Sequence, residues 1–241
     1  AEDGIRDRSP SRGLGDVYKR QTLRREGAVS IITMNDGKAN VFSRPMSMTI
    51  ESLLDDVPTD GGSLLITGKP GILSGGFDLN VINEGTAEDR RVMTKAGFSL
   101  LRRIYSFPRP VVIACSGHSI ALGAFLLFCA DYRIGIQGDF RIGANEIMNN
   151  MNVPVPILEI AKTRVATAHW YRAMLNSEIY LISDAVAPGY LDEVVEPDQL
   201  LPEALKKATA MAELGHPFYE VTKGMDQASV LDRIDAAIAS M

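Results

Sequence analysis

Two glycine-bearing turns hold the residue types best suited to chemistry in this sequence. Residues 73–79 read Leu-Ser-Gly-Gly-Phe-Asp-Leu, and residues 115–125 read Cys-Ser-Gly-His-Ser-Ile-Ala-Leu-Gly-Ala-Phe. Each turn follows an apolar, strand-like run and leads into a helical pattern. Glycine lets the backbone approach a ligand, and the first N–H groups of a helix have no acceptor within the helix. Two such donors aimed at one oxygen form an oxyanion hole, which is the chemistry that the two turns together predict.

The second turn also permits a serine hydrolase, because residues 117–121 come close to the G-x-S-x-G nucleophile elbow. That hypothesis makes Ser119 the nucleophile, Asp184 or Asp192 the orienting acid, and His216 the base, in the chain order Ser, Asp, His. An alanine replaces the second glycine of the elbow, however, and a small packing role explains Ser119 equally simply. We keep the triad as the lesser alternative.

The composition indicates a globular protein with small-molecule partners. The chain has 241 residues, 46% of them hydrophobic, which is enough to bury a substantial core in one large domain. Its 23% charged residues and net charge of -5 argue against a nucleic-acid surface, although they allow a local basic patch for a phosphate-bearing ligand. Cys115 and Cys129 lie in apolar runs without C-x-x-C spacing, so we expect reduced, buried thiols and no metal or redox site.

The N-terminal end differs in character from the rest of the chain. Residues 1–21 are rich in charged residues and lack helical or strand periodicity, so we predict a disordered arm or a non-native leader there. No apolar stretch reaches the roughly 18 residues that a membrane span needs, and the charged start lacks the apolar core of a signal peptide. We therefore expect a cytoplasmic protein without membrane contact, with its folded domain at residues 22–241.

Strand-like and helical patterns alternate from residue 28 onward. The expected strands are 29–34, 63–67, 111–115, 132–136 and 191–195, and the expected helices are 45–56, 88–105, 121–130, 156–164, 165–175, 200–214 and 230–239, with a short one near residue 183. Such alternation predicts the α/β class, with a mostly parallel sheet and right-handed crossovers.

Six segments of the chain, taken in order, resemble the crotonase superfamily, also called the enoyl-CoA hydratase/isomerase family. They are residues 38–43, 73–79, 110–117, 129–133, 142–147 and 185–195. The resemblance implies a spiral of ββα turns with its core at residues 22–195, and a C-terminal helical region at 196–241 that assembles a homotrimer or hexamer. It also implies an acyl-CoA thioester as substrate, a role in fatty acid metabolism, and no further cofactor or metal.

The resemblance assigns roles to residues of both turns. By position, the backbone N–H groups of Phe77 and Leu122 hold the thioester oxygen, which stabilises an enolate. Gly76, Asp78 and Phe125 border the substrate. Asp78 is also a candidate second acid, although an aspartate before an apolar helical run is more often an N-cap.

Other segments are implied to bind the remainder of the substrate. Lys38 and Ala39 match the stretch whose backbone meets the adenine of coenzyme A and whose lysine lies near phosphate. Lys69 and Lys223 are weaker candidates for a phosphate contact. Residues 81–105, a loop followed by a long helix, are expected to border the acyl tunnel.

The acid–base residues at two positions distinguish hydration from isomerisation, and Glu146 occupies one of them. Hydrating members of the family commonly carry two glutamates, and here Phe125 stands at the first position while Glu146 keeps the second. One carboxylate is enough to move a proton from the α-carbon to the γ-carbon, so the resemblance favours an enoyl-CoA isomerase. A hydratase with one acid replaced and a non-catalytic acyl-CoA-binding protein stay open as alternatives. So does a solvated loop carboxylate at Glu146, because asparagines surround it at 145, 149, 150 and 152.

Overall fold

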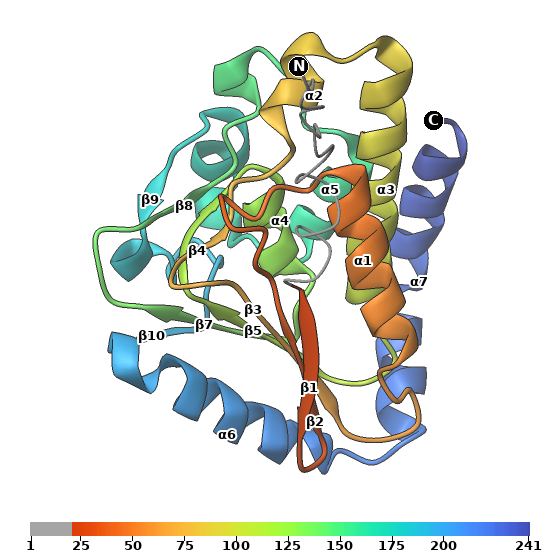
Figure 1. Cartoon of the computed structure of the whole chain (residues 1–241), viewed down its shortest axis with the longest axis vertical. Coiled ribbons are helices and arrows are strands. Elements are labelled where there is room, and N and C mark those ends of the chain that lie inside the picture. Colours follow the sequence, from red (N-terminus) through yellow and green to blue (C-terminus); the bar gives the residue numbers. More distant parts are fainter. Residues whose placement is uncertain (1–20) are drawn as a thin grey trace, which may run out of the picture.

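The computed structural model describes residues 21–241, and its larger sheet has six strands (Figure 1). In spatial order they are β1 (Thr22–Glu26), β2 (Val29–Thr33), β3 (Ser63–Thr67), β5 (Val111–Cys115), β7 (Tyr132–Ile136) and β10 (Glu193–Val195). β1 and β2 form an antiparallel hairpin, whereas all later neighbours are parallel, so the prediction of a mostly parallel sheet is confirmed. The predicted arm at 1–21 lies outside the described residues except for Gln21.

A second, smaller sheet has four short strands. In spatial order they are β4 (Gly71–Ser74), β6 (Gly117–Ile120), β8 (Arg141–Gly143) and β9 (Tyr180–Leu181). β4, β6 and β8 each follow a strand of the larger sheet along the chain, and a helix comes after each of them. The chain therefore repeats a ββα turn, which confirms the implied crotonase-like spiral. The sequence analysis missed this sheet because strands of two to four residues are too short to display a period.

The helices surround both sheets. In chain order they are α1 (Arg44–Asp55), α2 (Leu79–Glu84), α3 (Ala87–Tyr105), α4 (Leu122–Phe128), α5 (Val155–Lys162), α6 (Leu200–Ala212) and α7 (Phe218–Ala239). Short 3₁₀ turns occur at Ile147–Asn149, Thr167–His169, Ile182–Asp184 and Pro197–Gln199, and a π-helical turn occurs at Tyr171–Leu175. The long helix α3 begins at a capping box, in which Thr86 and Asp89 satisfy each other's backbone N–H groups.

Two predicted helices need correction. The helix expected at 165–175 is wrong, because a 3₁₀ turn and a π-helical turn occupy this stretch instead. The helix expected at 230–239 is only the second half of α7. Exposed Phe218 and Met225 in the first half obscure the amphipathic pattern that would have extended the prediction.

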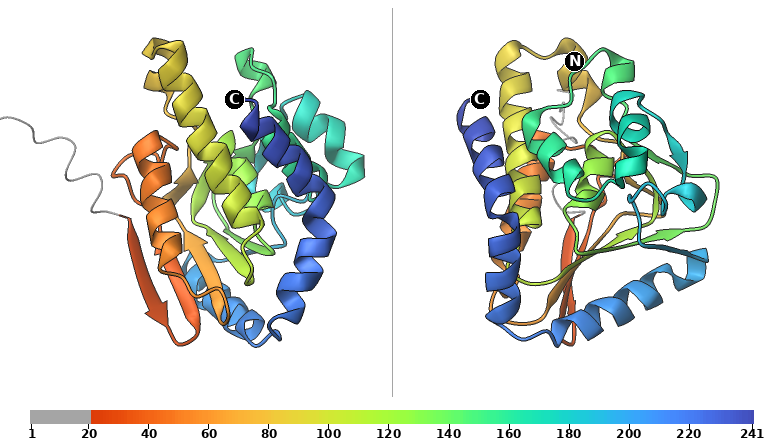
Figure 2. Two further views of the ribbon diagram at one scale, coloured as in Figure 1. Left: turned by 90° about the vertical axis from the view of Figure 1, so that its right-hand side faces the viewer. Right: turned by 180° about the vertical axis from the view of Figure 1, so that it is seen from behind.

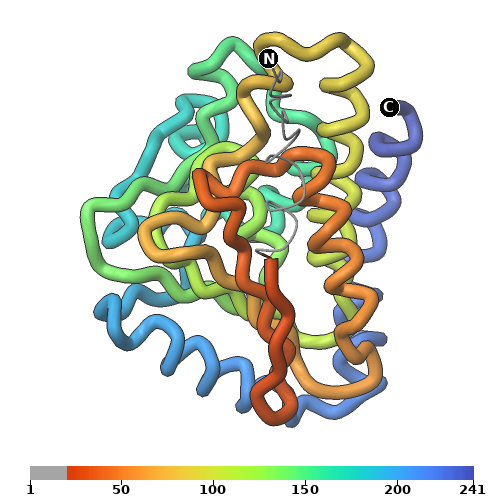
Figure 3. Tube along the Cα trace, viewed as in Figure 1, coloured from red at the N-terminus to blue at the C-terminus, as the bar shows by residue number. Residues whose placement is uncertain are grey.

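The helices form layers around the sheets (Figures 1 and 2). α6 packs across the larger sheet, against β2, β3, β5 and β7. α1 packs against α3, and α7 packs against α3 and α5, so that the chain ends beside α3 (Figure 3). Every residue of α4 is buried, which fixes the position of the second glycine-bearing turn at its start.

Two further expectations bear on the class of protein. Cys115 and Cys129 are free and buried, as predicted, and burial raises the pKa of the Cys115 thiol to about 12. Within residues 21–241, no helix combines the length and the apolarity that crossing a membrane requires.

Candidate active site

The two glycine-bearing turns lie against each other at the start of two helices. The first turn joins β4 to α2, and the second runs through β6 and Ala121 into α4. Gly76 has φ of 89° and Ala121 has φ of 51°, a left-handed backbone that redirects each chain from strand to helix. A Cβ atom on Gly76 would stand 3.2 Å from the backbone nitrogen of Leu122, so the two turns are in close contact.

Phe77 and Leu122 meet on the surface of α3. A Cβ atom on Gly97 of α3 would lie 2.6 Å from the Phe77 ring and 3.1 Å from Leu122 Cδ2, so this glycine makes room for both side chains. The backbone N–H groups of Phe77 and Leu122 donate no hydrogen bond within the described chain, whereas the N–H of Ala121 donates to the carbonyl oxygen of Gly143 at 3.0 Å. The structure thus brings the two predicted donors together and gives neither N–H an acceptor among the described residues, although of the two only Phe77 lines the cavity described next.

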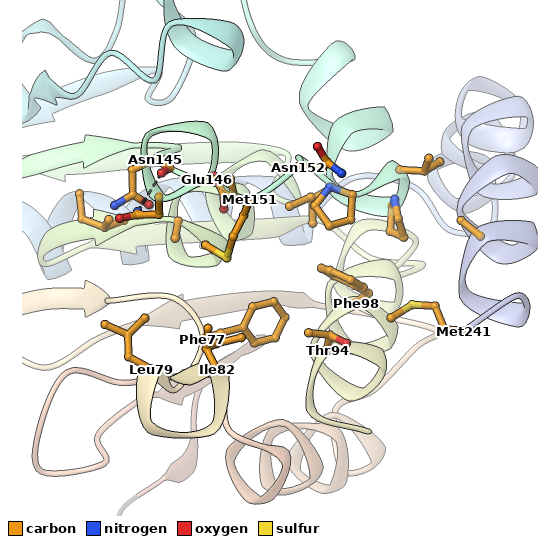
Figure 4. A pocket seen from close by; sticks show the side chains of 18 of the residues that line it. Phe77, Leu79, Ile82, Thr94, Phe98, Asn145, Glu146, Met151, Asn152 and Met241 are labelled. Atoms are coloured by element: carbon orange, nitrogen blue, oxygen red, sulfur yellow. Dashed lines mark hydrogen bonds between the residues drawn. The ribbon is translucent and has the colours of Figure 1, made fainter. Parts of the chain in front are cut away.

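A cavity of about 810 Å³ opens beside these donors (Figure 4). α2, α3, α5, α7 and the loop after β8 supply most of its wall. In Figure 4, Phe77 and Ile82 lie on one side of the space, with Glu146 and Met151 on the other. Among the described residues that line this cavity, Glu146 carries the only ionisable side chain. The cavity therefore presents one carboxyl group in a largely apolar wall.

Glu146 is buried in that wall. The residue is only 7% exposed, and its Oε2 atom has no hydrogen-bond partner among residues 21–241. Burial raises the pKa of Glu146 to about 7, while the backbone N–H groups of Glu146 and Asn145 oppose the shift more weakly. A carboxyl group with such a pKa can take up and return a proton near neutral pH. The alternative of a solvated loop carboxylate is wrong.

The loop after β8 fixes the position of Glu146. The carbonyl oxygen of Glu146 accepts hydrogen bonds from the N–H groups of Asn149 at 3.0 Å and Met151 at 2.9 Å. On the other side, the N–H of Ala144 donates to the hydroxyl of the buried Tyr190 at 3.4 Å. Glu146 is thus held by a closed turn after it and by an anchored strand end before it.

Three of the residues expected to border the substrate lie outside the cavity wall. Phe125 is fully buried and packs edge-on against Phe128, with ring centroids 6.0 Å apart. Asp78 caps α2, because its side chain accepts a hydrogen bond from the N–H of Asn80 at 3.0 Å. Gly76 is buried in the turn behind the wall. The structure gives these three residues packing, capping and backbone roles.

The segment expected to meet coenzyme A lies next to the cavity. The carbonyl oxygen of Ala39 accepts a hydrogen bond from the N–H of Gly75 at 2.8 Å, and Gly75 belongs to the cavity wall. Lys38 is exposed beside it, and neither Lys38 nor Ala39 lines the cavity itself. Lys69 is partly buried and also lies outside the wall. The site therefore leaves Lys38 in solvent, within the chain segment that adjoins the cavity.

The serine hydrolase hypothesis is wrong, because the structure does not assemble its triad. Ser119 is fully buried, and its hydroxyl donates to the carbonyl oxygen of Gly123 at 2.8 Å. His216 lies 3.6 Å from Glu220 on α7, and the carboxylate of Asp192 is engaged by Arg133 at 2.8 Å. Ser119 therefore has a packing role, which was the alternative to a nucleophile in the sequence analysis.

Lys223 is an internal residue. Its Nζ atom lies 2.8 Å from Asp131 Oδ2, and its side chain is only 8% exposed. Burial lowers the pKa of Lys223, although the charge of Asp131 opposes the shift. Lys223 therefore ties α7 to the turn between α4 and β7 through a buried ion pair, and the expected phosphate contact is wrong.

The sequence analysis missed the contribution of α7 to the cavity. Ala237, Ser240 and Met241 line it at the far end from the glycine-bearing turns. The expectation for residues 81–105 agrees with the wall, to which Ile82 and Phe98 contribute. No local signal marks the role of α7, because the contact joins segments more than a hundred residues apart.

Comparison with known proteins agrees with this fold. The family model described as enoyl-CoA hydratase/isomerase matches residues 24–238. A putative enoyl-CoA hydratase of Thermus thermophilus is 26% identical over 204 residues, which cover 82% of this chain and 80% of that protein. The mitochondrial enoyl-CoA delta isomerase 1 of Mus musculus is 25% identical over 223 residues, which cover 90% of this chain and 77% of that protein.

Solved structures are similar over almost the whole chain. An enoyl-CoA hydratase/isomerase family protein of Pseudomonas syringae has a TM-score of 0.88 and 35% identity, and the match covers 95% of this chain and 97% of that one. The apo structure of an enoyl-CoA isomerase of Mycobacterium tuberculosis has a TM-score of 0.84 and 34% identity, covering 91% and 96%. The chain belongs to the enoyl-CoA hydratase/isomerase family. Its relatives include proteins named as hydratases and proteins named as isomerases.

Proposed function

We propose that this protein moves the double bond of an enoyl-CoA thioester, with Glu146 as its single acid–base group. One observation carries the proposal: Glu146 is a buried carboxyl group with a pKa of about 7, and it is the only ionisable side chain that residues 21–241 contribute to the wall of a largely apolar cavity. By the family resemblance, Phe125, which is fully buried, stands where hydrating members commonly carry a further glutamate. Isomerisation needs one proton carrier, and hydration asks for a second group that activates water.

The proposed reaction begins from a 3-enoyl-CoA. The Glu146 carboxylate removes a proton from C2, and the electron pair of that C–H bond moves toward the thioester oxygen. The backbone N–H groups of Phe77 and Leu122 donate to this oxygen, and each such donor is worth roughly 3 to 4 kcal/mol of barrier. Glu146 then returns the proton to C4, so that the double bond moves to C2–C3 and the carboxylate is regenerated.

Coenzyme A enters this proposal as part of the substrate, with no other cofactor. The nucleotide is proposed to lie along Lys38 and Ala39, since Ala39 hydrogen bonds to Gly75 at the cavity wall. Replacing Lys38 with alanine should raise KM for an acyl-CoA up to about fivefold, as exposed ion pairs contribute little. The same variant should leave KM unchanged for an acyl-pantetheine, which lacks the nucleotide phosphates. An equal rise for both thioesters would contradict this placement.

The proposal extends to assembly. A homotrimer or hexamer is supported by exposed apolar side chains on α7, where Phe218 is 77%, Val221 is 54% and Met225 is 69% exposed along one face. Sedimentation analysis should give the mass of three or six chains, and a monomer at micromolar concentration would contradict the proposal. A cytoplasmic location stays a prediction.

Glu146→Gln tests the proposed reaction directly, because it keeps the size of the side chain and removes its acid–base chemistry. The wild-type protein should convert a 3-enoyl-CoA to the conjugated 2-enoyl-CoA, which is followed by absorbance and mass. The variant should lose roughly 10²- to 10⁴-fold in kcat. Undiminished conversion by the variant would refute the role of Glu146. Binding without any product from the wild type would favour the non-catalytic acyl-CoA-binding protein.

A further inference from the structure

The cavity continues well beyond Glu146. In Figure 4 it runs between two rows of side chains, from Leu79 past Glu146 and Phe77 to Met241. Thr94 of α3 also lines this far part, beside α7. The space therefore extends from the proposed reaction centre to the C-terminal helix.

The size of the cavity exceeds what a short acyl group requires. A volume of about 810 Å³ equals the space of roughly two dozen groups the size of a water molecule, at ~30 Å³ each. A four-carbon acyl chain fills only a small part of it. Burying further methylene groups against apolar side chains is favourable, so longer acyl chains that fill the rest of the cavity should bind more tightly.

The polarity of the wall sets the direction in which the substrate lies. Beyond Glu146 the wall includes Phe98, Pro156 and Ile157, all buried, and within the described chain no charged side chain lines that part. Phosphate groups have no partner there. The nucleotide must then leave on the side of Gly75, and the hydrocarbon chain must extend toward α7.

The end of the cavity is held in place by the packing of α7. Arg102 of α3 donates two hydrogen bonds of 2.8 Å to Asp235 of α7, and Arg233 of α7 lies 2.6 Å from Glu159 of α5. α7 is thus attached to α3 and α5, two of the helices that contribute to the cavity wall. Ala237 follows both attachments in sequence, two residues after Asp235, and lines the far end. Its small side chain leaves the depth that a longer residue would fill.

We propose that the substrates are enoyl-CoA thioesters with chains of eight or more carbons, and that Ala237 sets the depth available to the chain. This inference rests on the proposed function for the reaction, and on the shape of the cavity for the chain length. A larger side chain at Ala237 would occupy the space of the terminal carbons. The first carbons, next to Phe77 and Glu146, would stay in place.

Binding of saturated acyl-CoA thioesters tests the inference without turnover. Isothermal titration with chains of four, six, eight and ten carbons should give a Kd that falls roughly three- to fourfold per added methylene. The gain should stop only when the chain reaches α7. Equal affinity for the four- and ten-carbon chains would overturn the proposal, and so would failure to bind any of them.

Neighbouring alanines on α7 supply a matched pair of variants. Ala237 lines the cavity and Ala236 is exposed, so Ala237→Phe and Ala236→Phe add the same ring to the same helix. We expect Ala237→Phe to reduce the ratio of ten-carbon to four-carbon affinity about tenfold or more, which corresponds to at least two lost methylene contacts. Ala236→Phe should keep the wild-type ratio. Equal ratios in the two variants would refute the role of Ala237.

A smaller change guards against misfolding. Ala237→Met adds a flexible, unbranched side chain that favours helix, and it should lower the same ratio by a smaller amount. Circular dichroism establishes that each variant is folded. If affinity rises with chain length but no isomerase activity is found, the proposed reaction is refuted and this inference stands. If isomerase activity is found but all chains bind equally, this inference is refuted and the proposed reaction stands.

Discussion

Gly76 and Ala121, which belong to different ββα turns, lie so close that a Cβ atom on Gly76 would stand 2.8 Å from that of Ala121. Each is followed directly by a proposed oxyanion donor, Phe77 or Leu122. Contact between the two turns therefore sets the separation of the two N–H groups. The absence of a side chain at Gly76 is what allows this contact.

Gly76→Ala should separate the turns and impair catalysis. The added methyl group would collide with Ala121 and crowd the nitrogen of Leu122, so one donor should move away from the oxygen. We expect kcat to fall by roughly 10²- to 10³-fold, the usual effect of losing one such donor. Steady-state isomerase assays measure this.

Gly71→Ala is the matched control for that experiment. Gly71 has φ of 87°, close to the 89° of Gly76, and a Cβ atom there would meet nothing within 4 Å. Both variants should carry a backbone strain of about 1 to 2 kcal/mol, measurable in urea unfolding. Only Gly76→Ala should lose activity beyond its loss of stability, and an equal loss in both would contradict the account of the donors.

The rate of isomerisation should depend on the charge of Glu146. The group acts first as a base, so kcat/KM should rise with pH and level off above the pKa of about 7. The pKa obtained from this kcat/KM profile is that of Glu146 in the protein without bound substrate. Glu146→Asp, which keeps a carboxyl group, should keep a pH-dependent limb at a lower rate, whereas a flat profile in the wild type would contradict the assignment.

Glu146 should also destabilise the folded protein above neutral pH. Its pKa rises from 4.5 in the unfolded chain to about 7, so the folded state binds the extra proton between these values. The free energy of unfolding should therefore fall as pH rises through this window, by about 3 kcal/mol in total. Glu146→Gln lacks this dependence.

Urea unfolding of the wild type and Glu146→Gln at about pH 5 and pH 8 measures that effect. The variant should gain stability relative to the wild type at the higher pH, up to about 3 kcal/mol. A difference between the two proteins that does not change with pH would mean that burial does not raise the pKa of Glu146.

Phe125 should contribute to stability and little to substrate binding. Replacing this fully buried ring with alanine should lower the free energy of unfolding by about 3 to 5 kcal/mol. Phe125→Leu, which retains an apolar side chain, should keep KM for a 3-enoyl-CoA near the wild-type value. A change of KM by an order of magnitude in Phe125→Leu would return Phe125 to the substrate space.

The central strands of the larger sheet were predictable because most of their residues are apolar and buried. β3, β5 and β7 have the predicted bounds, as buried parallel strands bounded by polar residues or turns. The antiparallel β1 was missed, because its sequence Thr-Leu-Arg-Arg-Glu is mostly charged, follows a charged segment, and has no buried residue that would give it an apolar period. The smaller sheet was missed because its strands depend on neighbours that are distant in sequence.

The backbone donors of the site were predictable from the sequence, whereas the burial and contacts of its side chains were less so. The position of Phe77 and Leu122 follows from glycine-bearing turns that the sequence displays. The burial of Glu146 depends on α5 and on the loop after β8, and composition alone favoured a solvated carboxylate. The roles of Lys223 and Ala237 depend on where α7 returns to the molecule, which no local pattern determines.

The products formed by the wild-type protein from a 3-enoyl-CoA and a 2-enoyl-CoA test the central claim most directly. Mass spectrometry separates the two reactions, because isomerisation keeps the mass and hydration adds one water. A single carboxylate predicts a conjugated product of unchanged mass from the 3-enoyl-CoA and no water adduct from either substrate. A hydroxyacyl-CoA as the main product of the 2-enoyl-CoA would contradict the account, because it would require a water-activating group in addition to Glu146.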